Sequence, residues 1–383
     1  MDKKKIAFIS ALPGSSDAFF MNHFERLVKE YDVTLITNFP KEYDRSHYIK
    51  MGVHCIDAPI VRKINISSDL KALFKLRKIF KEEMFDSVHS VTPKAGLLTS
   101  VAAWMVGVKV RIHIFTGQVW ATRKGVMRTI LKFMDKIITT FDNHILVDGE
   151  SQRQFLIKEG VLKDKNSEVL AHGSICGVKL EKFNISAEIR KREREKFCFN
   201  DDDVIYIFMG RLNHDKGIGE LYEAFNRLIA ECPTAKLLLY GNDEEGYDAQ
   251  SVNYENIKKG ENYFYPGRTL KPFDALQGGD IFVLPTWREG FGSSVIEAQA
   301  LGLPVITSDA YGVVDASVPN ETGLRCKVND SESLYLCMKQ LYNHPELCKK
   351  YGKAGRKRVI DLFDCNIVSN AWVEYYHRLV KPI

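Results

Sequence analysis

The sequence predicts an α/β fold with two doubly wound parallel sheets, each in a domain of its own. Short apolar runs rich in β-branched residues alternate with helical stretches along the chain, the pattern of repeated strand–helix–strand units. The 383 residues suffice for two or three domains with sizeable cores. A glycine turn near 173, a charged helix at 188–196 and an acidic turn at 201–203 separate two series of such units.

The first series begins directly after the basic run at 3–5. A signal peptide is the alternative for this start, but its apolar core ends after seven residues at Pro13 and no cleavage site follows, so a buried strand is favoured. The apolar and β-branched runs predict strands at 5–10, 33–37, 87–90, 110–115, 144–147 and 168–171. The stretches between them predict helices at 19–31, 69–83, 96–106 and 126–141.

The second series repeats the scheme. Its apolar runs predict strands at 204–209, 236–240, 262–265, 280–284 and 304–307. Its amphipathic stretches predict helices at 217–231, 293–301 and 331–343. The expected domains are therefore 1–180 and 181–365, with residues 366–383 after them.

The composition is that of an ordinary soluble globular protein, with 45% hydrophobic and 27% charged residues. The longest weakly polar stretch, 95–108, is shorter than the roughly 20 residues that span a bilayer. The eight cysteines show neither a C-x-x-C pair nor a Cys/His spacing for metal. These features predict free thiols in the cytoplasm and no metal site.

The charge is divided unevenly along the chain. Residues 1–180 carry 28 Lys and Arg against 19 Asp and Glu, a net of +9, and the remaining 26 and 30 give −4. Two segments, 71–81 and 111–136, concentrate the basic residues among apolar ones. Each is either a surface helix with one side in the core or a surface patch that binds an anionic membrane. Nucleic acid is disfavoured because no base-reading motif accompanies the charge.

The stretch from Leu284 to Pro304 carries the first chemical motif. A buried strand ends at Pro285, a loop with Gly290 and Gly292 follows, and a helix begins near 293. Glycines allow a close backbone approach and a helix N-terminus offers free N–H groups, so the loop predicts a phosphate site. Glu289 and Glu297 suit sugar hydroxyls, which donate to carboxylates. The alternative is a capping Ser293 with incidental acids.

The second motif, 209–217, follows the first strand of the second series. Arg211 and Lys216 lie at a strand-to-helix turn, where they supply two cations for a diphosphate. The alternative for Arg211 is a salt bridge at the domain interface.

The order of these motifs resembles a known family. G-R-L-x-x-x-K-G at 210–217 and P-x-x-x-E-G-F-G-x-x-x-x-E at 285–297 resemble the retaining GT-B glycosyltransferases of family four. H-S-V-T-P-K-A-G at 89–96 resembles a segment of their bacterial surface-polysaccharide members. The resemblance spans nearly the whole chain and continues through 302–306, 312–315 and 321–323. It implies two Rossmann-like domains facing a cleft, with a terminal helix at 366–383 that crosses back to the first domain.

The resemblance also implies roles for single residues of the second, donor-binding domain. Arg211 and Lys216 would hold the donor diphosphate and stabilise the leaving group, while Glu289 would position the donor sugar. Glu297 would hold the ribose hydroxyls and Arg268 would lie near the base. The N–H groups of Phe291 and Gly292 would help to position the sugar, and those of Ser293, Ser294 and Val295 would donate to the phosphates. Gly210 and Gly290 are further implied donor contacts. Gly14, in the first-domain loop after the first strand, would face the same cleft.

In the first, acceptor-side domain the resemblance implies His89, Lys94 and Gln118 as acceptor-side candidates. Relatives carry a His at the end of the strand before the cleft, where this chain has Thr116. Thr116 is therefore the implied catalytic counterpart. Its hydroxyl can hydrogen-bond, but it cannot take up and release a proton at neutral pH as a histidine can. His113, three residues earlier on the strand, is expected in the core. The family's same-face attack uses a diphosphate oxygen as base, so the resemblance implies no protein nucleophile. It also implies no metal requirement of the D-x-D kind and no cofactor.

These expectations describe a retaining, metal-independent glycosyltransferase. Its donor would be a nucleotide sugar, with UDP favoured by family habit, and its acceptor a polyprenyl-diphosphate-linked sugar in capsule or O-antigen assembly. Its place would be the cytoplasm, at the anionic inner face of the membrane. A UDP-sugar epimerase of GT-B fold and a noncatalytic nucleotide-sugar-binding protein are the alternatives. A turnover assay separates the three: a glycosyltransferase forms a glycoside and free nucleotide, an epimerase forms a sugar isomer, and a binding protein forms no product.

Overall fold

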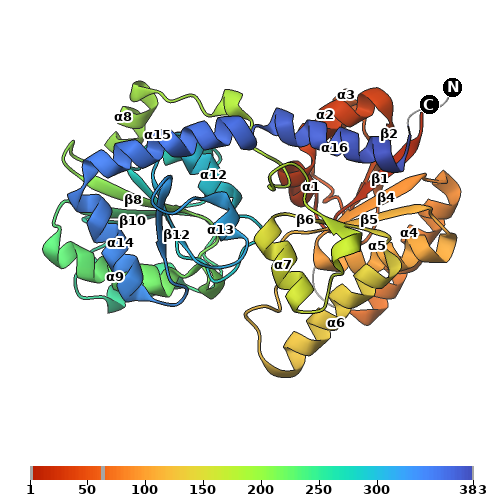
Figure 1. Cartoon of the computed structure of the whole chain (residues 1–383), viewed down its shortest axis with the longest axis horizontal. Coiled ribbons are helices and arrows are strands. Elements are labelled where there is room, and N and C mark those ends of the chain that lie inside the picture. The colour runs from red at the N-terminus through yellow and green to blue at the C-terminus, as the bar shows by residue number, and fades with distance from the viewer. Residues whose placement is uncertain (1–2, 62–64, 382–383) are drawn as a thin grey trace. The chain divides into compact units, whose positions relative to one another are not determined.

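The computed structural model describes residues 3–61 and 65–381. The chain divides into two compact units, the first formed by residues up to Gly177 together with those from Cys365 onward, the second by Val178–Asp364. Each unit is a parallel sheet with helices on both faces (Figure 1). This is the predicted α/β fold class. The expected boundaries, after 180 and after 365, lie within three residues of these divisions.

The sheet of the first unit has seven parallel strands in the order β3-β2-β1-β4-β5-β6-β7. The central strands are buried on both faces, which is why they read as continuous apolar runs rather than alternating ones. The strands are β1 (Lys5–Ile9), β2 (Asp32–Thr37), β3 (His54–Asp57), β4 (Ser87–Val91), β5 (Val110–Phe115), β6 (His144–Val147) and β7 (Ser167–Glu168). β1 occupies the apolar residues that would have formed the core of a signal peptide, so this segment is the predicted buried strand.

The helices of the first unit begin and end at recognisable residues. The Asn65 side chain caps α4 by accepting from the Ser68 N–H at 3.0 Å, and α5 ends at left-handed Gly107. The helices are α1 (Pro13–Phe19), α2 (Met21–Glu30), α3 (Ser46–Met51), α4 (Ile66–Glu83), α5 (Pro93–Val106), α6 (Gly125–Phe141), α7 (Glu150–Lys158) and the terminal α16 (Cys365–Leu379).

Helix α16 belongs to the first unit although 187 residues of the second unit, Val178–Asp364, precede it. It packs beside α2 (Figure 1), and its Trp372 ring stacks on His23 of α2 at 4.4 Å between centroids. His23 is also held by Ser369 Oγ at 2.9 Å and by the Ile175 carbonyl at 2.7 Å. Complete burial lowers the pKa of His23 to about 4, so this histidine stays neutral in the core.

The second unit has six parallel strands in the order β10-β9-β8-β11-β12-β13. They are β8 (Val204–Met209), β9 (Ala235–Tyr240), β10 (Tyr263–Gly267), β11 (Ile281–Leu284), β12 (Val305–Ser308) and β13 (Gly323–Cys326). The helices are α8 (Ala187–Glu195), α9 (Ile218–Glu231), α10 (Tyr247–Gln250), α11 (Pro272–Leu276), α12 (Ser293–Ala300), α13 (Val313–Ala316), α14 (Ser331–Asn343) and α15 (Pro345–Leu362).

The eight cysteines are all free thiols, as predicted. Among the helices that the structure describes, none combines the length and apolar composition needed to cross a bilayer. In the second unit β8 lies between β9 and β11, so the loops that leave the carboxyl ends of these three strands emerge side by side. Ligands of doubly wound sheets bind at this edge.

Candidate active site

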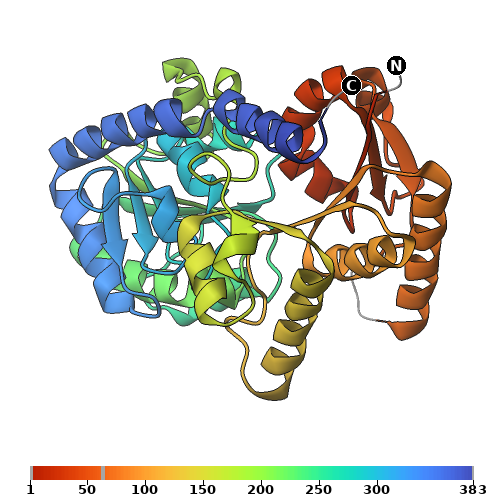
Figure 2. The ribbon, with the colours of Figure 1, turned by 45° about the vertical axis from the view of Figure 1, so that its right-hand side comes forward.

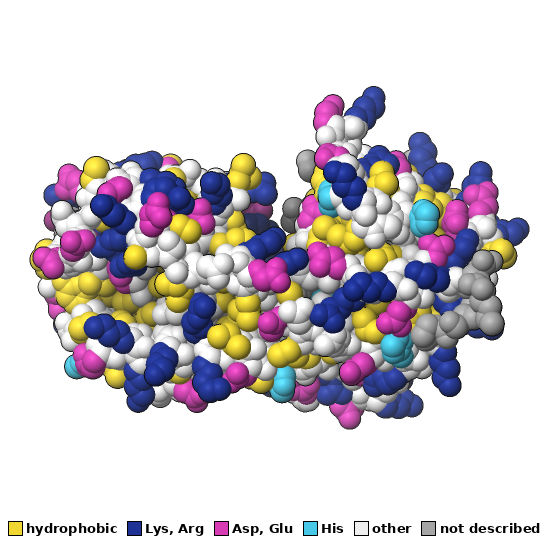
Figure 3. All heavy atoms as spheres, turned by 90° about the horizontal axis from the view of Figure 1, so that it is seen from above, with side chains coloured by type: hydrophobic (Ala, Val, Ile, Leu, Met, Phe, Trp, Pro, Cys, Tyr) yellow, Lys and Arg dark blue, Asp and Glu magenta, His cyan; other side chains and the backbone are white. Residues whose placement is uncertain are grey.

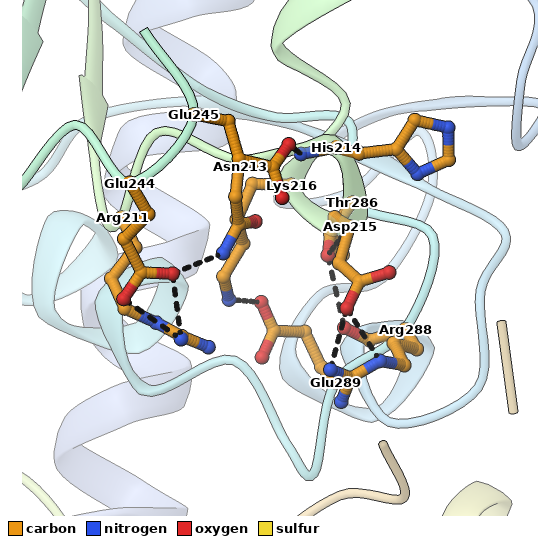
Figure 4. A network of polar contacts seen from close by, with 10 residues as sticks. All are labelled: Arg211, Asn213, His214, Asp215, Lys216, Glu244, Glu245, Thr286, Arg288 and Glu289. Carbon is orange, nitrogen blue, oxygen red and sulfur yellow. Dashed lines mark hydrogen bonds and ion pairs between the residues drawn. The ribbon is translucent and has the colours of Figure 1, made fainter. Parts of the chain in front are cut away.

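Three loops at the carboxyl edge of the second sheet bring charged side chains together. They follow β8 (residues 210–217), β9 (241–246) and β11 (285–292). Figure 4 shows their side chains turned toward one another in a network of hydrogen bonds and ion pairs. Both motifs predicted from the sequence, and one loop that was not predicted, contribute to this network.

The centre of the network is an ion pair between Lys216 Nζ and Glu289 Oε1 (Figure 4). The two side chains are only 16% and 15% exposed, so both charges are largely withdrawn from water. Such a pair is held by mutual attraction against a considerable desolvation cost. The residues expected to hold phosphate and sugar are therefore neighbours and neutralise one another.

Arg211 is held by the loop after β9. Its Nη1 lies 3.0 and 3.2 Å from the two carboxylate oxygens of Glu244, and the Asn213 amide donates to Glu244 at 2.8 Å. Arg211 thus has its partner within its own unit. Sequence reasoning did not single out Glu244 or its neighbour Glu245, which accepts from the His214 N–H at 2.9 Å. The available signal was the acidic run after the predicted strand at 236–240.

A second ion pair joins the loops after β8 and β11. Arg288 donates through Nε and Nη2 to Asp215 Oδ2, at 3.0 and 2.6 Å. The backbone carbonyl of Asp215 also accepts from the Thr286 hydroxyl at 2.9 Å and from the Trp287 N–H at 2.8 Å. These contacts lie next to Lys216 and Glu289 in the chain and therefore hold the two loops in register.

Gly217 allows the loops after β8 and β11 to approach this closely. Its φ is +70°, and a Cβ added there would overlap the backbone carbonyl of Pro285. Gly312 has the same role at the other side of Glu289, because a Cβ there would overlap the Glu289 carbonyl. The loops of the site thus approach one another so closely that positions 217 and 312 have no room for a side chain.

Replacing Gly217 by Ala is expected to lower the free energy of unfolding by about 2 kcal/mol or more, since it adds both a left-handed strain and a backbone overlap. Urea unfolding measures the effect. Gly219→Ala is the matched control, because it lies in α9 with open space around it, and Ala should add stability there by roughly 0.5–1 kcal/mol. Equal effects of the two substitutions would contradict the packing argument.

Helix α12 begins immediately after Gly292, which has φ +95°. The buried Phe291 ring anchors the loop against Phe363 in an edge-on contact at 5.3 Å. Ser293 and Ser294 form the first turn and are half-buried. The Val295 N–H, expected to face a phosphate, instead donates to the Gly292 carbonyl at 2.9 Å. The Val295 N–H is therefore already hydrogen-bonded within the first turn of α12, which corrects its expected role as a phosphate donor.

Glu297 lies one turn into α12. Burial raises the pKa of its carboxyl from 4.5 to about 7. The folded state therefore binds more protons than the unfolded chain between these values, and the contribution of Glu297 to stability falls as pH rises through that window. A hydrogen-bonding ligand that favours the ionised form would reverse this cost.

Glu297→Gln is expected to become more stable relative to the parent as pH rises from 5 to 8, by up to about 3 kcal/mol, because it removes the buried ionisation. Urea unfolding at the two pH values measures the difference. Exposed Glu255→Gln serves as control and should show no such trend. A pH-independent difference for Glu297→Gln would show that its carboxyl is not destabilised by burial.

The remaining donor-side residues lie at the same sheet edge. Gly210 follows β8 directly, and Gly290 is buried in the loop after β11. Arg268 follows β10, the strand next to β9, and is exposed. Within the described residues, no group of three or more His, Cys, Asp or Glu side chains is arranged to hold a metal ion.

The expected residues of the first unit have different surroundings. Gly14 lies in the first turn of α1 rather than in a loop, and it is exposed. Thr116 follows β5 and is half-buried. Lys94, in the first turn of α5, forms an ion pair with Asp69 at 2.7 Å. The chain thus uses this lysine internally, between α4 and α5.

His89 and Gln118, expected on the acceptor side, are both buried side chains. His89 stacks on Trp372 of α16 at 4.9 Å, and its Nδ1 lies 2.9 Å from the Tyr376 hydroxyl. Gln118 accepts from the Gln152 amide at 3.2 Å. Both side chains are therefore buried rather than exposed to an acceptor. His89 packs among aromatic side chains of the first unit, so it is a core residue rather than an acceptor-side one.

His113 is a core residue, as predicted. It is 1% exposed, its Nδ1 lies 2.8 Å from Ser90 Oγ, and burial lowers its pKa to about 3. A Cβ on Gly96 of α5 would overlap the His113 ring, which explains the glycine in that helix. His113 therefore stays neutral and packs β5 against α5.

Comparison with known proteins agrees with this architecture. The family described as "Glycosyl transferases group 1" matches residues 189–358, and "Glycosyl transferase 4-like" matches residues 5–141. The capsular polysaccharide biosynthesis glycosyltransferase CapM of Staphylococcus aureus is 31% identical over 92% of this chain and 91% of its own. UDP-Gal:alpha-D-GlcNAc-diphosphoundecaprenol alpha-1,3-galactosyltransferase of Escherichia coli is 26% identical over 86% of each chain.

Solved structures support the same fold. Anabaena HepE, in a crystal structure with UDP and glucose, superposes with a TM-score of 0.81 at 14% identity, over 98% of this chain and 100% of HepE. The two parallel sheets and their connections are thus those of the GT-B fold. With its characteristic loops after β8 and β11, its two matching family segments and its likeness to CapM, the chain belongs to the group 1 glycosyltransferases.

Proposed function

We propose that this glycosyltransferase moves a sugar from a UDP-sugar to a polyprenyl-diphosphate-linked acceptor, with retention of the anomeric configuration, during surface-polysaccharide assembly. The observation that carries the proposal is the Lys216–Glu289 pair. A cation and a carboxylate, nearly withdrawn from water, lie at the ends of two neighbouring strands where a diphosphate and a sugar would need them. A ligand with both groups would replace the pair by two separate contacts.

The proposed binding mode follows from the partners that each side chain has in the structure. Lys216 and Arg211 would exchange Glu289 and Glu244 for the diphosphate oxygens. Glu289 would then accept hydrogen bonds from the sugar hydroxyls, and ionised Glu297 from the ribose. The Ser293 and Ser294 N–H groups would add donors at the start of α12.

In the proposed reaction the acceptor hydroxyl oxygen forms a bond to the anomeric carbon on the face that the diphosphate leaves. The bond between that carbon and the diphosphate oxygen breaks, and the hydroxyl proton passes to the diphosphate. UDP departs with the electron pair and the proton. Lys216 and Arg211 stabilise the charge that develops on it, so the proposal requires no metal and no protein nucleophile. Thr116 would supply a hydrogen bond but would not act as a general acid or base.

The relatives support the choice of substrates. The name of the Escherichia coli relative specifies UDP-Gal as donor and a diphosphoundecaprenol-linked sugar as acceptor. CapM of Staphylococcus aureus is named for capsular polysaccharide biosynthesis. A polyprenyl-linked acceptor resides in a membrane, so the proposed place of action is the inner face of the cytoplasmic membrane.

Incubation with a panel of nucleotide sugars, with and without EDTA, tests the proposal. Slow release of UDP from one donor, unaffected by EDTA and accelerated by a lipid-linked acceptor, is the expected result. Formation of a sugar isomer would favour an epimerase, and tight binding without turnover a nucleotide-sugar-binding protein. Loss of activity in EDTA would contradict the metal-independent mechanism.

A further inference from the structure

Helix α6 presents its apolar side to the solvent. Val126 is 75% exposed, Met127 53%, Ile130 48% and Phe133 62%. Val126, Ile130 and Phe133 are spaced by four and three residues, and so form one stripe along the helix. Surface helices of globular proteins normally direct such a stripe into the core.

The opposite side of α6 packs on the protein with both apolar and polar side chains, among them buried Ile138 and partly buried Leu131. Asp135 is buried and accepts from the indole N–H of buried Trp120 at 2.6 Å. Arg128 and Lys132 both donate to Glu159, at 2.9 and 2.6 Å. The basic segment 111–136 is thus not a uniform charged patch, because Arg128 and Lys132 serve the fold. These polar contacts and the apolar packing of Ile138 and Leu131 hold the inner side of α6, so the exposed apolar stripe lies outside this packing.

The exposed charges of the described segment 111–136 are positive. Arg123 and Lys124 precede the helix and Lys136 lies on it, and each is exposed. The acid of this segment, Asp135, is buried beneath the helix. Figure 3 shows that Lys, Arg, Asp and Glu side chains are mixed over the face that it displays. The surface of α6 therefore complements an anionic, partly apolar partner.

The neighbouring helices extend this surface. Helix α6 packs against α5 and β5, and it lies on the outside of the first unit (Figure 2). Trp104 of α5, 55% exposed, contacts the Phe141 ring at the end of α6 at 4.9 Å. Tryptophan and other aromatic side chains favour the membrane–water interface.

We propose that the outer face of α6 inserts into the headgroup region of an anionic bilayer, with Val126, Ile130 and Phe133 below the headgroups and Arg123 and Lys124 among them. A bilayer fits better than a protein partner, since the stripe lies along a single helix and its exposed charges have one sign. The inference deepens the proposed function and rests on it for the acceptor, whose lipid lies in that bilayer.

The test is co-sedimentation with vesicles of phosphatidylcholine containing phosphatidylglycerol. The full-length protein is expected to bind them, and to retain part of its binding at about 0.5 M NaCl because apolar insertion is not screened. V126S/I130S/F133S should bind about 1000-fold more weakly, since burying each of the three side chains contributes roughly tenfold. R123S/K124S should lose mainly the salt-sensitive part and the preference for phosphatidylglycerol.

The control variant V252S/L336S/I360S removes exposed apolar side chains from the second unit and should bind like the parent. Phe133→Trp should gain fluorescence that brominated lipids quench. Equal binding by V126S/I130S/F133S and the parent would overturn the inference, as would absence of vesicle binding together with self-association of the parent through α6. Either result with UDP release intact leaves the proposed function standing, whereas vesicle binding without any donor turnover contradicts the function alone.

Discussion

Glu289→Gln is expected to lower the turnover of a nucleotide sugar on the order of 100-fold or more while UDP binds as tightly as before or more tightly. The carboxylate is assigned to the sugar, and errors in positioning the reacting group are costly in rate. In the structure it also holds Lys216 in an ion pair. Removing its charge frees Lys216 for the diphosphate, so affinity should not fall. Calorimetric UDP titration and single-turnover kinetics measure the two quantities.

Glu244→Gln is the matched comparison, because Glu244 pairs with Arg211 as Glu289 pairs with Lys216. It should change UDP affinity in the same direction and turnover far less, since Glu244 is not assigned to the sugar. If Glu289→Gln bound UDP far more weakly and processed bound donor at the normal rate, Glu289 would belong to the nucleotide site instead.

Lys216→Ala and Arg211→Ala should each weaken UDP binding by roughly 1.5–3 kcal/mol, the contribution of a charge-assisted hydrogen bond. The loss should be greater for Lys216, because its removal also leaves the 15% exposed carboxylate of Glu289 without its partner. Titration calorimetry with UDP and with uridine separates phosphate contacts from base contacts. Uridine affinity should stay unchanged in both variants.

Lys259→Ala is the control for charge removal, since Lys259 is an exposed lysine of the same unit, paired with Asp248. Its UDP affinity should equal that of the parent. Rescue of Lys216→Ala by Mg²⁺ would point to a metal-assisted diphosphate site, and an equal loss of UDP and uridine affinity would show that the variant disturbs the whole loop.

The strands that lie inside the sheets were predictable because burial on both faces leaves a continuous apolar run, as in β1 and β8. The edge strands β3 and β13 were missed. β3 is exposed or half-buried throughout, so its four residues carry no apolar run, and β13 is a short strand with Arg325 within it. Helix α15 was missed because it is rich in charged residues and two of its buried positions are glycines, Gly352 and Gly355, which disfavour a helix in the sequence. Both glycines are needed because a Cβ there would overlap the neighbouring segment at Gly302 and Gln299.

The candidate site was predictable in its loops but not in its pairing. Motif spacing located Arg211, Lys216 and Glu289, whereas which carboxylate neutralises which cation depends on loop geometry across β8, β9 and β11. Glu244 was therefore overlooked. His89 was misjudged for a related reason, since Tyr376 and Trp372, which cover it, lie nearly 300 residues further along the chain.

The same limit applies to the basic segment of the first unit. Its composition indicated a surface, but helix periodicity alone does not decide which side of α6 faces the protein. The packing of Ile138 and the ion pairs of Arg128 and Lys132 with Glu159 fix it, and all of these depend on contacts with other parts of the fold. The sequence located the basic segment and left a surface helix and a membrane contact open, whereas the exposed apolar stripe was visible only in the structure.

The most direct test of the central claim is the anomeric configuration of the product, measured by proton NMR on the glycoside formed from the active UDP-sugar and a polyprenyl-diphosphate-linked acceptor in the presence of EDTA. The proposed mechanism predicts stoichiometric release of UDP and a new glycosidic bond with the configuration that the sugar had in the donor. A product of inverted configuration would contradict the same-face mechanism assigned to this site.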